Sequence, residues 1–410
     1  MNKQQEPRLR FKGFVGAWEE KYLGKLAEQV KSYPLSRNVE TSEKTGFKYI
    51  HYGDIHRGIA DIIDSDENLP NIQAGNFELL KSGDLVIADV SEDYDGVGAA
   101  CVIDGSLKNK VVSGLHTIAI RPNQTISLFL YYLLKTQAFK QYGRLIGTGT
   151  KVVGITASKF LNFQTNIPTL PEQTHLGLFF RCLDSQIAES RAVLEKSRQL
   201  KKAMLAKMFP ANGEKIPKIR FKGFEGEWEK VVVGDLGDIV TGNTPTTSDK
   251  DNYAEDGLLW VTPTDIKKTV TTKTMKSLSE KGKKSARLLP PNSILVTCIA
   301  SIGKNTLIVE WGSCNQQINA LIPKKEFNPY FLFVLSEFWS EKMKKIAGSG
   351  TMDIINKTQF SEIETMLPIP KEQTAIGNFF RQLDETIALQ SAEVEKLNQL
   401  KKGLLAAMLV

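Results

Sequence analysis

The chain has 410 residues, of which 41% are hydrophobic and 24% charged, and its net charge is +7. This composition excludes a disordered protein and is sufficient for two domains with cores of their own. The small positive excess is spread along the chain and forms no polybasic tail, so any nucleic-acid binding needs a local patch.

The cysteine pattern and the N-terminus favour a cytoplasmic protein. Cys101, Cys182, Cys298 and Cys314 show neither close pairing nor the spacing of a metal site, which favours a reduced setting over a disulfide framework. The polar residues 1–6 lead into no apolar run, so we expect no signal peptide. No stretch approaches the roughly 18 apolar residues that a membrane span requires.

Residues 1–168 are predicted to form a first globular domain of the α+β class. Apolar residues at helical spacing predict one helix over residues 127–142, and a loop rich in Gly and Thr follows at residues 147–151. Short β-branched runs separated by Gly, Asp and Asn predict strands at residues 47–52, 84–88, 99–103 and 117–120.

A long helix is predicted over residues 169–210, because its apolar residues step by three and four, residues 172–208 contain no proline, and Phe209-Pro210 ends it. This spacing is typical of a coiled-coil seam. The residues expected to pair along it are Leu183, Ile187, Leu194 and Met204.

The chain then repeats this plan. A second globular domain is predicted over residues 211–367, entered through a linker at residues 210–217, and is followed by a second long helix over residues 368–410. More than half of the positions in residues 172–208 recur in residues 372–408, and the opening Phe-Lys-Gly-Phe motif recurs as well. The pairing residues expected on the second helix are Leu383, Ile387, Val394, Leu397 and Leu404.

The two globular segments keep the same order of features with few identical residues. Residues 49–55 correspond to 260–266, residues 82–86 to 292–296, and the Gly-rich residues 147–150 to 348–351. Two different surfaces on one scaffold suggest that each segment reads something different.

No catalytic signature is complete. Asn328-Pro329-Tyr330 lacks the second proline of an amino-methyltransferase motif, so we interpret it as a helix-opening turn. Gly303-Lys304 lacks the upstream glycine of a phosphate-binding loop, and Glu19-Glu20-Lys21 lacks the upstream aspartate of a nuclease pattern. The histidines, at positions 51, 56, 116 and 175, form no metal-ligand pair at helical spacing.

The basic segment, residues 267–287, is the one positive signal for a ligand. Hydroxyl side chains are interleaved with its cations, a combination suited to phosphate oxygens, although a solvated loop is the alternative interpretation. The corresponding residues 61–67 of the first copy are acidic. The DNA-binding candidates are Lys267, Lys268, Lys273, Lys276, Lys283, Lys284 and Arg287, together with Lys151 in the first Gly-rich loop.

The duplicated order of motifs resembles the DNA-specificity subunit of type I restriction-modification enzymes over essentially the whole chain. Each copy opens with Phe-Lys-Gly-Phe and Trp-Glu, and closes with Glu-Gln, Phe-Phe, Leu-Asp and Gln-Leu-Lys-Lys. The Gly-rich loops at residues 147–151 and 348–352 match a segment that lies near DNA in that family. Phe179, Phe180, Phe379 and Phe380 are expected to pack between helix and domain rather than to contact a partner.

The resemblance implies a subunit without catalysis of its own. Each globular segment would be a target-recognition domain for one half of a bipartite, asymmetric site, and the two helices would pair antiparallel, with pseudo-twofold symmetry, and set the gap. The implied partners are double-stranded DNA, two modification subunits that methylate adenine and restriction subunits, in a bacterial or archaeal cytoplasm. This chain is expected to bind no cofactor or metal, and S-adenosylmethionine and ATP with Mg are expected on the partners.

Two other classes of function remain open. A self-sufficient methyltransferase would need a cofactor motif, and the sequence shows none. A duplicated DNA-binding or scaffold protein without methyltransferase partners is the second alternative, and copurification with a methyltransferase chain would separate it from a specificity subunit.

Overall fold

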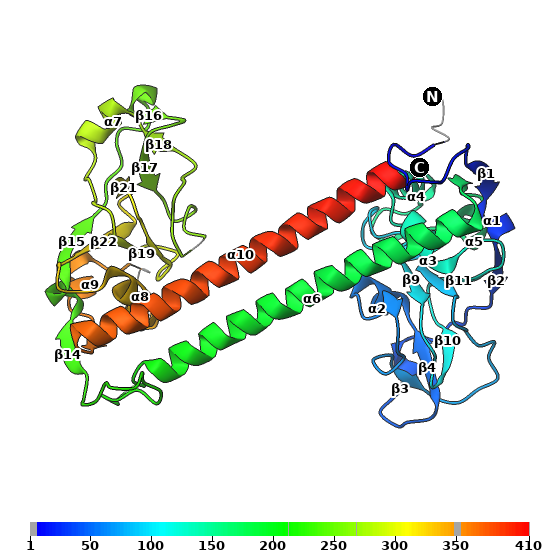
Figure 1. Ribbon diagram of the computed structural model, residues 1–410, viewed down its shortest axis with the longest axis horizontal. Helices are drawn as coiled ribbons and strands as arrows, with labels where there is room; N and C mark the ends of the chain where they lie inside the picture. Colours follow the sequence, from blue (N-terminus) through cyan, green and yellow to red (C-terminus); the bar gives the residue numbers. More distant parts are fainter. Residues whose placement is uncertain (1–5, 212, 268, 348–353, 410) are drawn as a thin grey trace. The chain divides into compact units, whose positions relative to one another are not determined.

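The computed structural model describes residues 6–211, 213–267, 269–347 and 354–409 (Figure 1). The chain forms two compact units. Unit 1 comprises residues 1–191 and 393–410, and unit 2 comprises residues 192–392. Each unit therefore contains the globular segment of one copy together with helix residues from both copies.

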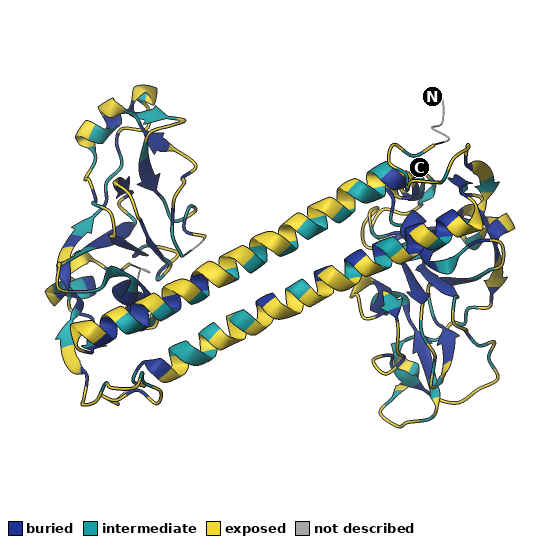
Figure 2. Ribbon diagram, viewed as in Figure 1, coloured by how far each residue is buried: buried dark blue, intermediate teal, exposed yellow. Residues whose placement is uncertain are grey.

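Unit 1 is built around a five-stranded sheet. Its order is β2 (Ala27–Val30), β11 (Thr117–Pro122), β7 (Leu85–Ala88), β9 (Ala100–Ile103) and β5 (Ile62–Ile63), and only the β5–β9 pairing is parallel. Because successive side chains of a strand face opposite sides, Leu85 and Ile87 enter one hydrophobic cluster while Val86 and Ala88 enter another. The sheet is thus covered on both faces, and Figure 2 shows its central strands β7, β9 and β11 mainly in the dark blue of buried residues.

Smaller sheets and short helices complete unit 1. A four-stranded sheet runs β10 (Lys110–Ser113), β4 (Phe47–Ile50), β6 (Asn71–Ile72) and β3 (Glu40–Thr41). Two pairs join β1 (Glu19–Tyr22) to β13 (Gln164–Ile167), and β8 (Val90–Ser91) to β12 (Val153–Gly154). The helices are α1 (Leu23–Leu26), α2 (Tyr52–His56), α3 (Ser127–Leu133), α4 (Gln137–Ile146) and α5 (Ala157–Leu161), with a 3-10 turn, η1, at Arg37–Val39.

The four predicted strands are confirmed, but the single helix predicted over residues 127–142 is wrong. The structure has two helices there, α3 and α4, separated at residues 134–136. The hydroxyl of Thr136 accepts a hydrogen bond from the backbone N–H of Phe139 at 3.4 Å and so caps the start of α4. A threonine that satisfies an orphan helix N–H favours a new N-terminus at this position.

Unit 2 repeats this plan. One sheet runs β15 (Gly237–Thr241), β22 (Ile318–Pro323), β19 (Ile294–Thr297) and β20 (Asn305–Leu307), and another runs β16 (Tyr253–Ala254), β18 (Ser277–Leu278), β17 (Leu258–Val261) and β21 (Gly312–Cys314). β14 (Glu229–Val232) pairs with β23 (Glu364–Leu367), and the helices are α7 (Glu280–Ser285), α8 (Pro329–Ala347) and α9 (Lys357–Ser361). Two 3-10 turns, η2 (Val233–Asp235) and η3 (Lys250–Asn252), complete the unit.

The pairing patterns show which strands correspond between the copies. β4 pairs parallel to β10 in unit 1, as β17 does to β21 in unit 2. β7 pairs antiparallel with the six-residue strand β11, as β19 does with the six-residue strand β22. These pairings agree with the correspondences of residues 49–55 with 260–266 and of 82–86 with 292–296.

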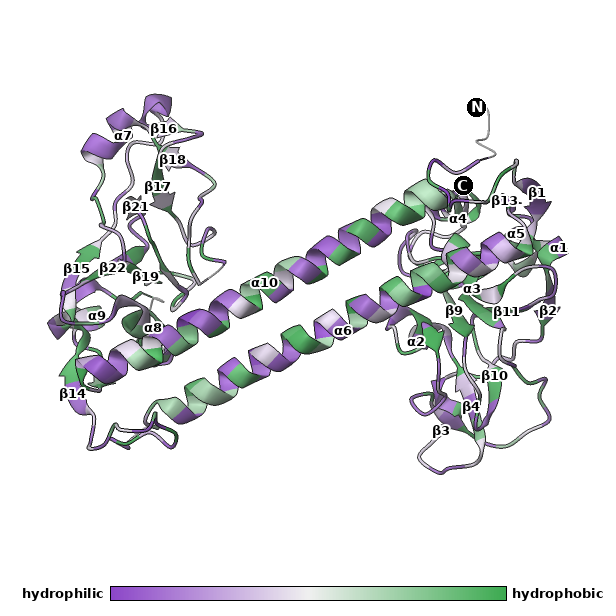
Figure 3. Ribbon diagram, viewed as in Figure 1, coloured by the Kyte–Doolittle hydropathy of each residue, from purple (hydrophilic) through white to green (hydrophobic). Residues whose placement is uncertain are grey.

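The long helices are α6 (Leu170–Met208) and α10 (Pro370–Met408), and in each unit a part of one lies antiparallel to a part of the other. In unit 1 Asp184 contacts Lys401, and Arg191, further along α6, donates to Asn398 at 3.0 Å. In unit 2 Lys201 lies 2.8 Å from Asp384, and the ring of Phe209, just beyond α6, lies 6.0 Å from that of Phe380. Figure 3 shows hydrophobic and hydrophilic positions alternating along both helices.

The repeated ends of each copy join in the same way. Leu9 donates its backbone N–H to Ala407 at 2.9 Å in unit 1, and Ile219 donates to Lys207 at 2.9 Å in unit 2. Each opening segment is therefore hydrogen-bonded to the helix end of the other copy.

Candidate nucleic-acid interface

The start of each long helix is fixed by the same pair of residues. Arg10 binds both carboxylate oxygens of Glu172 at 2.7 Å, and Arg220 binds those of Glu372 at 2.7 Å. Both glutamates are buried, and paired guanidinium bonds of this kind satisfy a buried carboxylate. The repeated Glu is therefore a structural clamp.

The repeated Gln and Phe-Phe also serve the packing of helix against domain. Gln173 accepts from the hydroxyl of Thr125 at 2.7 Å and donates to the carbonyl of Pro168 at 2.8 Å. Phe180 and Phe380 are fully buried in the two main cores, while Phe179 and Phe379 are partly buried against them, as expected for packing residues.

The predicted seam residues of the long helices differ in burial. Leu183, Ile187 and Leu194 are buried, whereas Leu383, Ile387, Val394 and Leu397 are half-buried. Met204 packs on the main core of unit 2 and Leu404 on that of unit 1. The ends of both helices thus contribute to the core of the other copy's globular segment.

The basic segment belongs to unit 2; it follows β17 in the chain and includes β18 and α7. Lys267, Lys273, Lys276, Lys284 and Arg287 are exposed and Lys283 is half-buried, whereas Lys268 lies outside the described residues. Asp265 holds the segment by accepting the backbone N–H of Met275 at 2.8 Å.

Some cations of the basic segment are engaged by neighbouring groups. Lys281 lies 2.7 Å from Asp249, a contact that raises the pKa of the lysine, and Lys283 lies 3.5 Å from Glu280. The Arg287 guanidinium donates to the carbonyl of Thr241 at 2.6 Å. Of the described cations in this segment, Lys281, Lys283 and Arg287 therefore already have partners within unit 2.

The acidic residues 61–67 of unit 1 contact basic side chains. Asp61 lies 2.8 Å from Lys135, and Glu67 lies 2.7 Å from Lys108. Asp64 and Asp104 both contact Arg181 of α6. This region of unit 1 thus differs in charge from the basic segment of unit 2.

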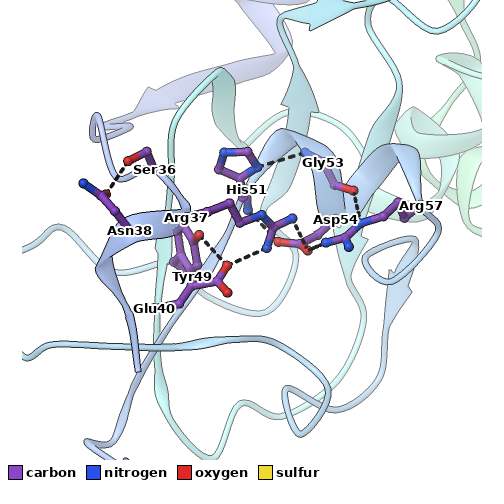
Figure 4. A network of polar contacts seen from close by, with 9 residues as sticks. All are labelled: Ser36, Arg37, Asn38, Glu40, Tyr49, His51, Gly53, Asp54 and Arg57. Carbon is purple, nitrogen blue, oxygen red and sulfur yellow. Dashed lines mark hydrogen bonds and ion pairs between the residues drawn. The ribbon is translucent and has the colours of Figure 1, made fainter. Parts of the chain in front are cut away.

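A polar network that the sequence did not indicate surrounds Asp54 in unit 1 (Figure 4). The buried Asp54 carboxylate accepts from Arg37 at 2.8 Å and from Arg57 at 3.0 Å, while Glu40 accepts from Arg37 at 2.6 Å. Desolvation and the hydrogen bond to Glu40 raise the pKa of Tyr49 well above its ordinary value. These charges compensate one another, and the network fixes the start of α2.

Three of the four histidines gather around Tyr52. The ring of His51 lies 4.4 Å from that of Tyr52, and the rings of His116 and His56 lie 5.4 and 6.0 Å from it. His116 has φ of 57° and its Nδ1 lies 3.3 Å from Asp89, whose pKa is raised by burial. Among the described residues no group of His, Cys, Asp or Glu has the arrangement of a metal site.

Of the two Gly-rich loops, only the first is described. Lys151 is exposed there, and the Tyr94 hydroxyl donates to the carbonyl of Gly149 at 3.2 Å. Residues 348–352 lie outside the described residues.

Asn328-Pro329-Tyr330 opens α8, as its interpretation as a turn predicted. The side chain of Asn328 accepts from the backbone N–H of Phe331 at 2.9 Å, and Pro329 is the first helical residue, where it needs no N–H. The hydroxyl of Tyr330 donates to Asp384 at 2.9 Å, so this tyrosine has a structural partner. Among the described helices, none has both the length and the apolar character of a membrane span.

A family model described as the type I restriction modification DNA specificity domain matches residues 16–196 and again residues 225–399. The chain is 24% identical to the type I restriction enzyme HindI specificity subunit of Haemophilus influenzae, over 96% of this chain and 98% of that protein. It is 20% identical to a putative type I restriction enzyme MjaX specificity subunit of Methanocaldococcus jannaschii, over 96% and 92%.

Solved structures share the fold. The crystal structure of a type I restriction-modification S subunit from M. genitalium superposes with a TM-score of 0.68 at 14% identity, covering 99% of each chain. A chain from a structure on complex assembly and conformational transition of the type I system gives 0.53 at 19% identity, covering 95% of this chain and 96% of the other.

Proposed function

This chain belongs to the family of the type I restriction modification DNA specificity domain, of which it carries two copies, and from that premise we propose that each copy reads one half of a bipartite, asymmetric DNA site. The chain is a specificity subunit and not the catalytic component of its system. The observation that carries the proposal is the duplication of the globular segment. The two copies share one backbone plan, but residues 267–287 of unit 2 are basic and the corresponding residues 61–67 of unit 1 are rich in Asp.

Because the chain is not the catalytic component, we propose that partner subunits carry out the catalysis. Two modification subunits would bind S-adenosylmethionine and methylate adenine, and restriction subunits would supply ATP- and Mg-dependent cleavage. Since methylation requires the target base to leave the duplex, a subunit that positions DNA for other chains needs contacts along the backbone as well as to bases. The exposed lysines of the basic segment and Lys151 are the candidates for those backbone contacts.

The test is to map methylated adenines in DNA from cells that contain the modification subunit, with and without this chain. We expect one asymmetric two-part motif that disappears with the chain. Exchanging residues 1–168 for those of a relative should then change one half of the motif only. A swap that altered both halves would contradict modular recognition, and failure to copurify with any methyltransferase would favour a DNA-binding scaffold.

A further inference from the structure

The amide turn, which we define as residues 315–317 between β21 and β22, is held rigidly in unit 2. Asn315 donates its backbone N–H to Val261 at 3.0 Å, and the carbonyl of Gln317 accepts from Cys298 at 2.8 Å. The turn is thus tied to β17 on one side and to the end of β19 on the other. A loop fixed to two sheets can present its side chains with little loss of conformational freedom on binding.

The amide side chains of this turn are also oriented. The buried Asn315 donates its Nδ2 to the oxygen of Gln317 at 3.0 Å and accepts the Gln317 backbone N–H at 3.1 Å. The oxygen of Gln316 accepts from the hydroxyl of Thr244. Gln316 is exposed and Gln317 is half-buried, so both reach the surface from a defined position.

The basic segment is attached next to the amide turn. Asn243 donates its Nδ2 to the carbonyl of Ser285 at 2.8 Å, and its oxygen accepts the Arg287 backbone N–H at 2.8 Å. The adjacent residue, Thr244, is the one that holds Gln316. Oriented amides therefore lie beside a run of cations, the two components that base reading and phosphate positioning require.

Unit 1 has the same turn with different side chains. Gly114 donates to Ile50 at 2.9 Å as Asn315 does to Val261, and the carbonyl of His116 accepts from Asp89 at 3.1 Å as that of Gln317 does from Cys298. The positions of the two glutamines are occupied by Leu115 and His116. An equivalent backbone that carries different hydrogen-bonding groups is what two unlike half-sites demand.

We propose that Gln316 and Gln317 read base edges in the half-site of the second copy, and that adenine is the base they select. A glutamine amide supplies one acceptor and one donor, which match the N6 amino group and N7 of adenine in the major groove. The proposal rests on the proposed function, because it assigns residues to the recognition that the chain carries out.

The test uses the chain assembled with its modification subunits and a pool of duplexes with random sequence. The wild-type complex, Gln316→Ala, Gln317→Ala and Gln316→Glu are each allowed to select DNA, and the selected motifs and dissociation constants are compared. Gln399→Ala, at an exposed glutamine on α10, is the matched control. Thermal unfolding of each variant checks that the amide turn still folds.

Each alanine variant should lose preference at one or two neighbouring positions of a single half-site, with discrimination there reduced by roughly tenfold or more. Gln316→Glu should shift preference at the Gln316 position from adenine toward cytosine, because a carboxylate accepts from the cytosine N4 amino group. If the wild-type complex selects a two-part motif and neither glutamine variant alters it, or if both weaken all sequences equally, the assignment is wrong. If the wild-type complex selects no motif, the proposed function itself fails.

Discussion

The ammonium of Lys201 lies 2.8 Å from the carboxylate of Asp384, and it joins the end of the first copy's helix to the start of the second copy's helix within unit 2. In unit 1 Lys401 contacts Asp184 in the same way. The lysine of the Gln-Leu-Lys-Lys motif and the aspartate of the Leu-Asp motif recur because each completes a pair with the other copy.

Replacing Lys201 by Met should destabilise unit 2 by roughly 1–3 kcal/mol. The pair is partly buried, with 18% and 8% of the two side chains exposed, so the cost should lie between that of surface pairs and that of fully buried ones. Urea unfolding of the variant measures it, and Lys202→Met, at the exposed neighbour, is the control. Equal stability of the two variants would show that the pair contributes nothing.

Replacing Arg220 by Lys should also destabilise unit 2, by about 1–3 kcal/mol. Lysine keeps the charge but cannot bind both oxygens of Glu372, so one oxygen of this buried carboxylate loses its partner. The midpoint of urea unfolding reports the loss. Lys222→Ala, at an exposed position of the same motif, should leave the midpoint unchanged.

Changing Lys267, Lys273 and Lys284 to Ala should flatten the salt dependence of DNA binding by the assembled complex. Removing one lysine–phosphate interaction lowers the slope of log affinity against log salt by about 0.9. Lys281→Ala is the matched control, because its ammonium already contacts Asp249 at 2.7 Å. An unchanged slope for the triple variant would identify the basic segment as a solvated loop.

His51 should make unit 1 sensitive to acid. Burial, followed by the charge of Arg37, lowers the pKa of His51, whose Nδ1 accepts the Gly53 N–H at 3.1 Å and must be unprotonated to do so. Because the unfolded chain binds this proton more readily, the stabilisation is complete above a pH of about 6.5 and is lost as the pH falls below it. His51→Asn keeps a capping acceptor that does not titrate.

Melting temperatures measured from pH 7 to pH 5 test this prediction. The decline should be shallower for His51→Asn than for the wild-type chain. Parallel curves for the two proteins would mean that other groups cause the acid sensitivity.

Lengthening both long helices should change the spacing of the recognised site. One heptad inserted after Glu195 and after Glu395 keeps the apolar spacing and adds about 10 Å, or roughly three base pairs of DNA. We expect the variant to methylate a longer site or to lose activity through the accompanying rotation of the duplex. Efficient methylation of the original site would refute this role of the helices.

The sequence predicted the elements whose signal is local and missed those that depend on distant residues. The strands at Leu85–Ala88 and Thr117–Pro122 and both long helices follow from side-chain periodicity. The break at Thr136 was missed because its neighbours continue the helical spacing on either side. The side-chain cap of Thr136 starts a new helix there, although the apolar periodicity continues.

Fewer contacts of the candidate site could be predicted from the sequence, because they join residues far apart along the chain. The clamp on Glu172 joins residues 162 positions apart, so nothing near the glutamate indicates its partner. His51 and His116 meet at Tyr52 only because β4 and β10 lie side by side. The amide turn carries no motif of its own, and aligning it with residues 114–116 required the backbone hydrogen bonds.

The bond from Leu9 to Ala407 has the same form as that from Ile219 to Lys207. Each opening segment is therefore bound to the end of the other copy's long helix, at equivalent places in the two units. A half-length chain with one copy also carries both parts of each contact. If each copy reads one half-site, as we propose, two such molecules paired through these contacts would read a palindromic site.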